Sequence, residues 1–138
     1  MYDPVLVEPM RKELTELGVE ELTTADEVNQ LLENHTGTAL VVVNSVCGCA
    51  AAHARPGVAM ALQHSKKPDR ITTVFAGMDL EATSRAREYF RGFFPSSPQI
   101  ALMKDGEVAF MLERHDIEGR TALDVAERLI EAFNEHCG

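Results

Sequence analysis

Residues 41–56 read VVVNSVCGCAAAHARP, and this stretch decides the expected fold. It opens with three valines and becomes polar at Asn44 and Ser45. Two cysteines one residue apart come next, followed by an alanine-rich segment with high helix propensity. The pattern predicts a buried strand, then a tight turn, and then two thiols held at the first turn of a helix.

Thiols at a helix start are chemically distinctive. The free backbone N–H groups and the positive end of the helix dipole favour an anion there, and they lower a cysteine pKa from about 8.5 to roughly 3.5–7.5. The thiolate is the form that attacks disulfides. We therefore predict a redox site in which Cys47 attacks and Cys49 resolves. Gly48 is expected to let the turn form and also to give a bulky mixed disulfide close access. Because Cys-x-Cys closes a very short ring, a strained and easily reduced disulfide is expected.

Length and composition narrow the class of protein. With 138 residues, 45% of them hydrophobic and 25% charged, the chain is expected to form a single domain spanning 1–138. A formal charge of −9 argues against non-specific nucleic-acid binding. There is no apolar run of the length a membrane helix needs, and the first residues do not resemble a signal peptide. A cytoplasmic location is expected, where paired cysteines are typically catalytic, redox-sensing or metal-binding.

Hydrophobic periodicity predicts alternating helices and strands along the chain. Helices are expected at 3–17, 25–33, 47–64, 80–91 and 121–135, and strands at 19–22, 38–44, 71–76, 99–104 and 107–114. Pro9 should kink the first helix or delay its start, and Pro56 should kink the third. The order favours an α/β fold, with a central mixed β-sheet flanked by helices on both faces.

The arrangement of these motifs resembles the thioredoxin fold. A strand leads to a cysteine pair at a helix start, a proline lies further along that helix, and Ser97-Pro98 heads a later strand. The sequence is more specifically similar to the bacilliredoxin family, small thioredoxin-like proteins with a Cys-Gly-Cys motif. The matching segments are PMRKELTELG, EELTTADEV, LVVVNSVCGCAAAHARPG, TVFAGMD, REYF, PSSPQIALMK and RHDIEG.

The resemblance implies an activity that the residue patterns alone do not. Family members are expected to remove bacillithiol from mixed disulfides on cytoplasmic client proteins, with bacillithiol as co-substrate and no bound cofactor. Some members are also credited with disulfide isomerase activity. The resemblance further implies a cis Ser97-Pro98 bond beside the thiols, although a simple strand-entry turn is the alternative. Residues 115–119 match the family pattern without a physical role that the sequence reveals.

Several side chains keep two interpretations. Arg55 is either a solvated charge or a cation that attracts the malate group of bacillithiol, and His53 is either a packing residue or one that tunes Cys49. Cys137 is either a flexible tail thiol or a resolving thiol. A metal- or cluster-binding module using Cys47 and Cys49, with His53 or Cys137, is the alternative of a different class.

Overall fold

The apolar run predicted as a strand forms β2 (Thr38–Asn44), and all seven of its residues are buried. The computed structural model describes residues 1–138. Side chains on a strand alternate between faces, so Leu40 and Val42 enter one hydrophobic cluster while Val41 and Val43 enter another. A strand with apolar residues on both faces is typical of a sheet covered by helices on both sides.

Five strands form one mixed sheet in the order β1-β3-β2-β4-β5. The other four strands are β1 (Glu20–Glu21), β3 (Arg70–Phe75), β4 (Gln99–Lys104) and β5 (Glu107–Leu112). β3 runs parallel to both β1 and β2, whereas β4 runs antiparallel to β2 and to β5. The predicted α/β fold with a central mixed sheet is confirmed.

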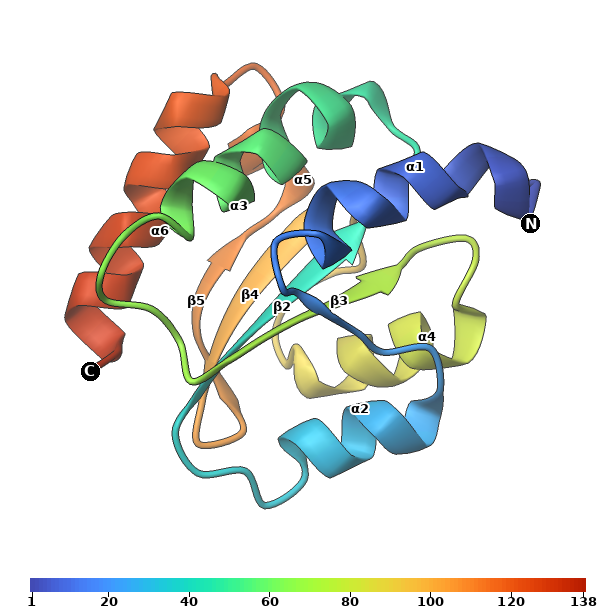
Figure 1. Ribbon diagram of the computed structural model, residues 1–138. Coiled ribbons are helices and arrows are strands. Elements are labelled where there is room, and N and C mark those ends of the chain that lie inside the picture. Colours follow the sequence, from blue (N-terminus) through green and yellow to red (C-terminus); the bar gives the residue numbers. More distant parts are fainter.

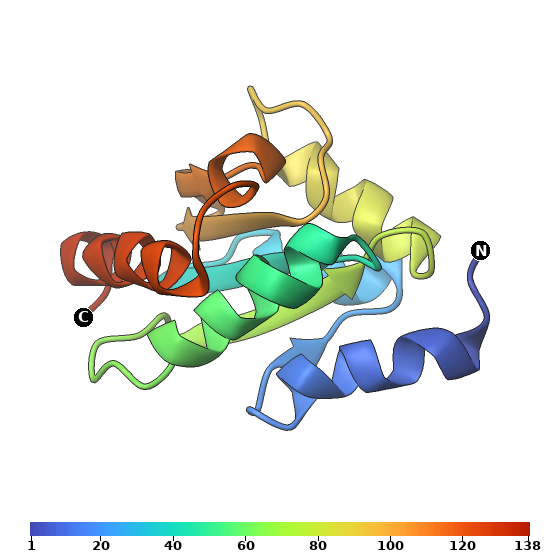
Figure 2. The same ribbon diagram turned by 90° about the horizontal axis from the view of Figure 1, so that it is seen from above.

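Helices cover both faces of this sheet (Figure 1; Figure 2). One face carries α2 (Ala25–Leu32) and α4 (Leu80–Tyr89), and the other carries α1 (Pro4–Thr15), α3 (Arg55–Ala61) and α6 (Ala122–His136). No helix of the chain has the length and apolar character needed to cross a membrane.

The strand directions bring four separate segments to one edge of the sheet. β2, β3 and β5 all end at this edge, because β5 is antiparallel to β4 and β4 is antiparallel to β2. β4 begins at the same edge for the same reason. The loops that follow β2, β3 and β5 and the loop that precedes β4 therefore meet there, although their residues are far apart in the sequence.

The helix that begins at the cysteine pair differs from the predicted helix at 47–64. It begins at Gly48, passes through a five-residue π-helical segment, η1 (Ala50–Ala54), and continues as α3 to Ala61, short of the predicted end at residue 64. The Arg55 N–H bonds to the Ala50 carbonyl, five residues back. The expected disturbance near Pro56 thus takes the form of a widened turn that immediately precedes the proline.

Two further predictions are corrected. Pro9 does not delay the first helix, because Asp3 caps it and Pro4 is already its first residue. The last strand ends at Leu112 and not at residue 114, and the next four residues form a short helix, α5 (Arg114–Ile117). Its cap is reciprocal between the backbone and side chains of Glu113 and Asp116.

Candidate active site

The turn that leads to the thiols is fixed by a buried arginine. Arg55 is 2% exposed, and its Nη1 donates to Asn44 Oδ1 at 2.9 Å and to the Ser45 carbonyl at 2.8 Å. Its Nε lies 3.1 Å from Glu13 Oε1, an ion pair without hydrogen-bond geometry. Arg55 therefore ties the end of β2 to the helix, and the prediction that it is solvated or attracts a ligand is wrong because its guanidinium faces inward.

Cys47 occupies the N-cap position of the helix. Its carbonyl accepts hydrogen bonds from the N–H groups of Ala50 and Ala51, at 3.0 and 3.3 Å. Its own N–H donates to Ser45 Oγ at 3.2 Å, and the Cys49 N–H points at Cys47 Sγ from 3.4 Å. Partial burial tends to raise the Cys47 pKa, but the Cys49 N–H and thiol, the Arg114 charge and the Ala50 N–H outweigh it, so the pKa of Cys47 is lowered.

Cys49 lies in the opposite electrostatic situation. Its sulfur is 3.8 Å from Glu118 Oε2, a distance at which the thiol donates to the carboxylate. Partial burial, the neighbouring Cys47 and the negative charge of Glu118 together raise the pKa of Cys49, against a smaller lowering effect of Arg114. Both thiols are free and partly exposed. The surroundings of the pair thus favour the thiolate form at Cys47 and the protonated form at Cys49.

The short helix α5 and its C-cap residue supply two charged residues that the sequence analysis missed. Arg114 Nε donates to Glu118 Oε2 at 2.9 Å, its backbone N–H donates to Ser96 Oγ at 3.3 Å, and Nη1 donates to the Ser97 carbonyl at 3.4 Å. Arg114 and Glu118 belong to the segment RHDIEG, which matched the family pattern without a known role. The available signal was that match together with the spacing of four residues between a cation and an anion.

A groove of about 470 Å³ opens beside Cys47 at the shared edge of the sheet. Its lining includes Ser45, Ser97, Arg87 and Arg114. A larger cavity of about 730 Å³ lies between α2, α4 and the β4–β5 turn, but no cysteine lines it. The groove is the better candidate site because it contains the reactive sulfur.

The remaining predicted site residues lie close to this groove. The Ser97–Pro98 bond is cis, as predicted, and Ser97 lines the groove beside Cys47. Gly48 is exposed, does not have positive φ, and has no atom within 4 Å of where a Cβ would stand. The turn therefore does not require a glycine, whereas the open space around Gly48 fits close access by a ligand.

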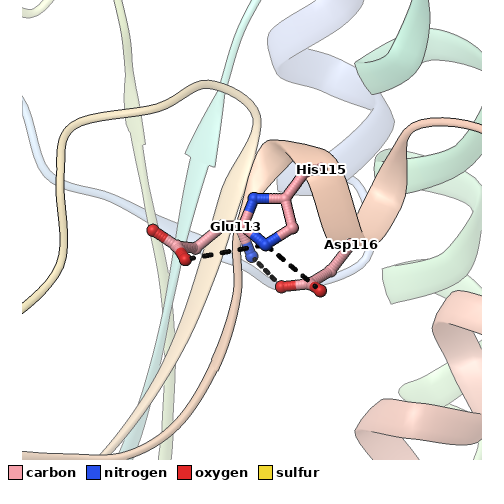
Figure 3. A group of neighbouring side chains, drawn as sticks. All are labelled: Glu113, His115 and Asp116. Atoms are coloured by element: carbon pink, nitrogen blue, oxygen red, sulfur yellow. Dashed lines mark hydrogen bonds and ion pairs between the residues drawn. The ribbon is translucent and has the colours of Figure 1, made fainter.

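The structure does not assemble a metal site around the cysteines. The single cluster with suitable ligand atoms within 4.8 Å of one another consists of Glu113, His115 and Asp116 (Figure 3). Asp116 Oδ2 in this cluster already accepts the Glu113 N–H at 3.0 Å as part of the helix cap, and the His115 side chain is 75% exposed. Glu113 and Asp116 are explained by the cap of α5, and His115 is an exposed neighbour of that cap.

Cys137 is remote from the other two thiols. Its sulfur is buried and interacts with Thr38, the first residue of β2, whereas Cys47 follows the last residue of that strand. A strand of seven residues is roughly 20 Å long. The prediction of a flexible tail thiol is wrong because Cys137 is buried. The alternatives in which Cys137 resolves the Cys47 adduct or joins it in binding a metal are wrong because it lies at the other end of β2.

The fold and the paired thiols together define a class. The chain is a thioredoxin-fold thiol–disulfide oxidoreductase, and solved thioredoxins share its architecture. A cysteine-to-serine mutant of Entamoeba histolytica thioredoxin superposes with a TM-score of 0.57, covering 85% of this chain and 98% of that one at 15% identity. Malassezia sympodialis thioredoxin gives a TM-score of 0.56, covering 86% and 90% at 16% identity. At such low identity these likenesses establish the fold.

Sequence relatives identify the family within that class. The family described as "Disulphide isomerase" matches residues 2–137. A bacilliredoxin of Halalkalibacterium halodurans is 54% identical over 96% of this chain and 90% of its own length. Bacilliredoxins of Koribacter versatilis and Salinibacter ruber are 51% and 55% identical, covering 100% and 99% of this chain and 95% and 82% of their own lengths. The chain belongs to the bacilliredoxin family.

Proposed function

We propose that this protein removes bacillithiol from mixed disulfides on cytoplasmic client proteins. The observation that carries the proposal is the difference between the two thiols, since the pKa of Cys47 is lowered and that of Cys49 is raised. A stabilised thiolate next to a protonated thiol suits a reaction that attacks first and resolves second. The bacillithiol substrate is taken from the family, whose members of about 50% identity bear the name bacilliredoxin.

In the first step the Cys47 thiolate attacks the bacillithiol sulfur of the mixed disulfide. A bond forms between Cys47 and the bacillithiol sulfur, the bond to the client sulfur breaks, and the client leaves as a thiolate that takes a proton from solvent. Arg114, which lowers the pKa of Cys47, stabilises the attacking charge. The open space around Gly48 leaves room for the adduct.

In the second step Cys49 releases the small thiol. Its proton passes to a base, for which the Glu118 carboxylate at 3.8 Å is positioned, and the Cys49 sulfur attacks that of Cys47. The bacillithiol thiolate departs and a Cys47–Cys49 disulfide remains, which two further small thiols reduce in successive exchanges, leaving as their own disulfide. Alternatively, another bacillithiol attacks the adduct directly and leaves as bacillithiol disulfide. No bound cofactor is needed in either route.

Whole-protein mass spectrometry after incubation with a bacillithiolated client tests this division of labour. Cys47→Ala should abolish transfer, while Cys49→Ala should accumulate an adduct heavier by one bacillithiol. Cys137→Ala should behave like the unaltered protein, because Cys137 is buried far from the site. An adduct trapped on Cys49 in the Cys47→Ala variant would reverse the assigned roles, and an unreacted client with the unaltered protein would overturn the function.

Disulfide isomerisation is a second candidate function, favoured by the description of the matching family. In that reaction Cys47 attacks a client disulfide, and a different client thiol displaces it before Cys49 does. Reactivation of an enzyme with scrambled disulfides should then need Cys47 and survive Cys49→Ala. Loss of reactivation in both variants would exclude this route.

A further inference from the structure

Arg87 places a positive charge in the groove beside Cys47 that no acidic residue neutralises. The residue lies on α4, and its Nη2 donates to the Ser96 carbonyl at 2.8 Å. Its Nε is buried and has no hydrogen-bond partner. The side chain is half-buried, and this burial lowers the pKa of Arg87. Arg87 remains charged, since an arginine keeps its proton in proteins.

Arg87 differs from the other arginines near the site, because no carboxylate pairs with it although the chain is rich in acidic residues. Twenty-two acidic residues face thirteen lysines and arginines. The other arginines that lie close to the site have acidic partners, with Arg11 bound to Asp79, Arg55 paired with Glu13, and Arg114 bound to Glu118. A partly buried charge without a counter-ion is costly, and a bound anion would offset this cost. The unpaired guanidinium therefore indicates an anionic ligand in the groove.

We propose that Arg87 is a specificity-determining residue that binds a carboxylate of the small thiol joined to Cys47. Cys47, Arg87 and the hydroxyl-bearing residues Ser45 and Ser97 line the same groove. The ligand class is a small thiol that carries carboxylates, for which the malate group of bacillithiol is an example. The inference rests on the proposed function in one respect, that Cys47 takes up a small thiol.

The test uses synthetic disulfides in place of bacillithiol. In a Cys49→Ser Cys137→Ser background, the protein is mixed with 2-pyridyl disulfides of mercaptosuccinate, which carries two carboxylates, or of mercaptoethanol, which carries none. The Cys47 thiolate attacks the small-thiol sulfur, a Cys47–S–S–R bond forms, and pyridine-2-thione leaves with the electrons of the broken bond. Absorbance of the thione gives the rate with each probe, and the ratio of the two rates measures anion preference.

Arg87→Gln should lower this ratio roughly tenfold, the effect of losing one charge-assisted hydrogen bond, while the mercaptoethanol rate changes little. Arg87→Lys should retain part of the preference because it keeps the charge. Arg85→Gln is the matched control, since Arg85 lies on the same helix, pairs with Glu88 and does not line the groove. Its ratio should be unchanged.

Two results would overturn the proposal. Equal slowing with both probes would mean that Arg87 only supports the Ser96 loop, and an unchanged ratio would mean that no carboxylate binds there. Failure of the proposed function is recognised separately. In that case the unaltered protein leaves a bacillithiolated client intact, while the probe ratio still reports on Arg87.

Discussion

At the scale of single residues, the two thiols differ because of the groups that surround each sulfur. Cys47 Sγ receives the Cys49 N–H and lies in the field of Arg114, while Cys49 Sγ faces Glu118. The cysteine spacing alone identified the pair and its position at a helix start. The charged residues come from a segment more than sixty positions later in the chain, so no local pattern could connect them to the thiols.

Arg114→Gln should shift the pH dependence of Cys47 alkylation to higher pH. The arginine charge stabilises the thiolate, so its removal raises the pKa of Cys47 and reduces the thiolate fraction near neutral pH. The measurement is the alkylation rate against pH in a Cys49→Ser Cys137→Ser background. Arg91→Gln, which removes an exposed charge lining the distant cavity, should leave the midpoint in place. A midpoint at unchanged or lower pH in Arg114→Gln would contradict this explanation.

At the scale of elements, the position of α3, the helix that continues from the thiols, depends on its close packing against α6. A Cβ added to Gly57 would lie 2.6 Å from Val125 Cγ1 and 2.7 Å from Val125 Cβ, with the Ala122 carbonyl at 3.1 Å. Val125 is itself buried and cannot swing aside. The two helices therefore approach at Gly57 to a distance that only glycine allows.

Gly57→Ala should destabilise the protein by about 1–3 kcal/mol, because overpacking outweighs the higher helix propensity of alanine. Urea unfolding followed by circular dichroism measures the change. Gly48→Ala is the matched control, since nothing lies within 4 Å of its added Cβ and its φ is not positive. That variant should stay within about 0.5 kcal/mol of the unaltered protein. Equal effects of the two substitutions would show that helix packing is not the cause.

The sequence predicted the bounds of those strands whose apolar runs are continuous and end at polar residues. β2 and β4 have the predicted bounds, because their apolar runs end at polar residues. The π-helical segment and α5 were missed for different physical reasons. A π-helical segment differs from an α-helix by one hydrogen-bond partner, which an alanine run does not encode. Four residues are too few to show a helical period, so the last strand was extended to residue 114 and residues 115–119 were left without a predicted element.

At the scale of the whole molecule, the sheet topology creates the site. The three strands that end and the one that begins at the same edge bring Cys47, Gly77, Ser97 and Arg114 to a single groove. The alternation of helices and strands predicted the fold class and the two-sided covering of the sheet. It could not predict the groove, since the groove depends on which strands pair and in which direction.

Cys137 is buried at the end of β2 that lies away from Cys47. The reactivity of its thiol therefore reports whether the C-terminal end of α6 is docked on the sheet. This thiol contacts β2 only while the end of α6 is in place, and burial raises its pKa. In a Cys47→Ala Cys49→Ala variant, a thiol reagent should label this single cysteine slowly, and low urea should accelerate labelling. Leu129→Ala, which removes a buried contact of α6, should also speed it. Labelling as fast as that of an unstructured cysteine peptide would show that the helix end is not docked. Docking of the last helix can thus be followed in the same chain as the redox chemistry, by a thiol that takes no part in it.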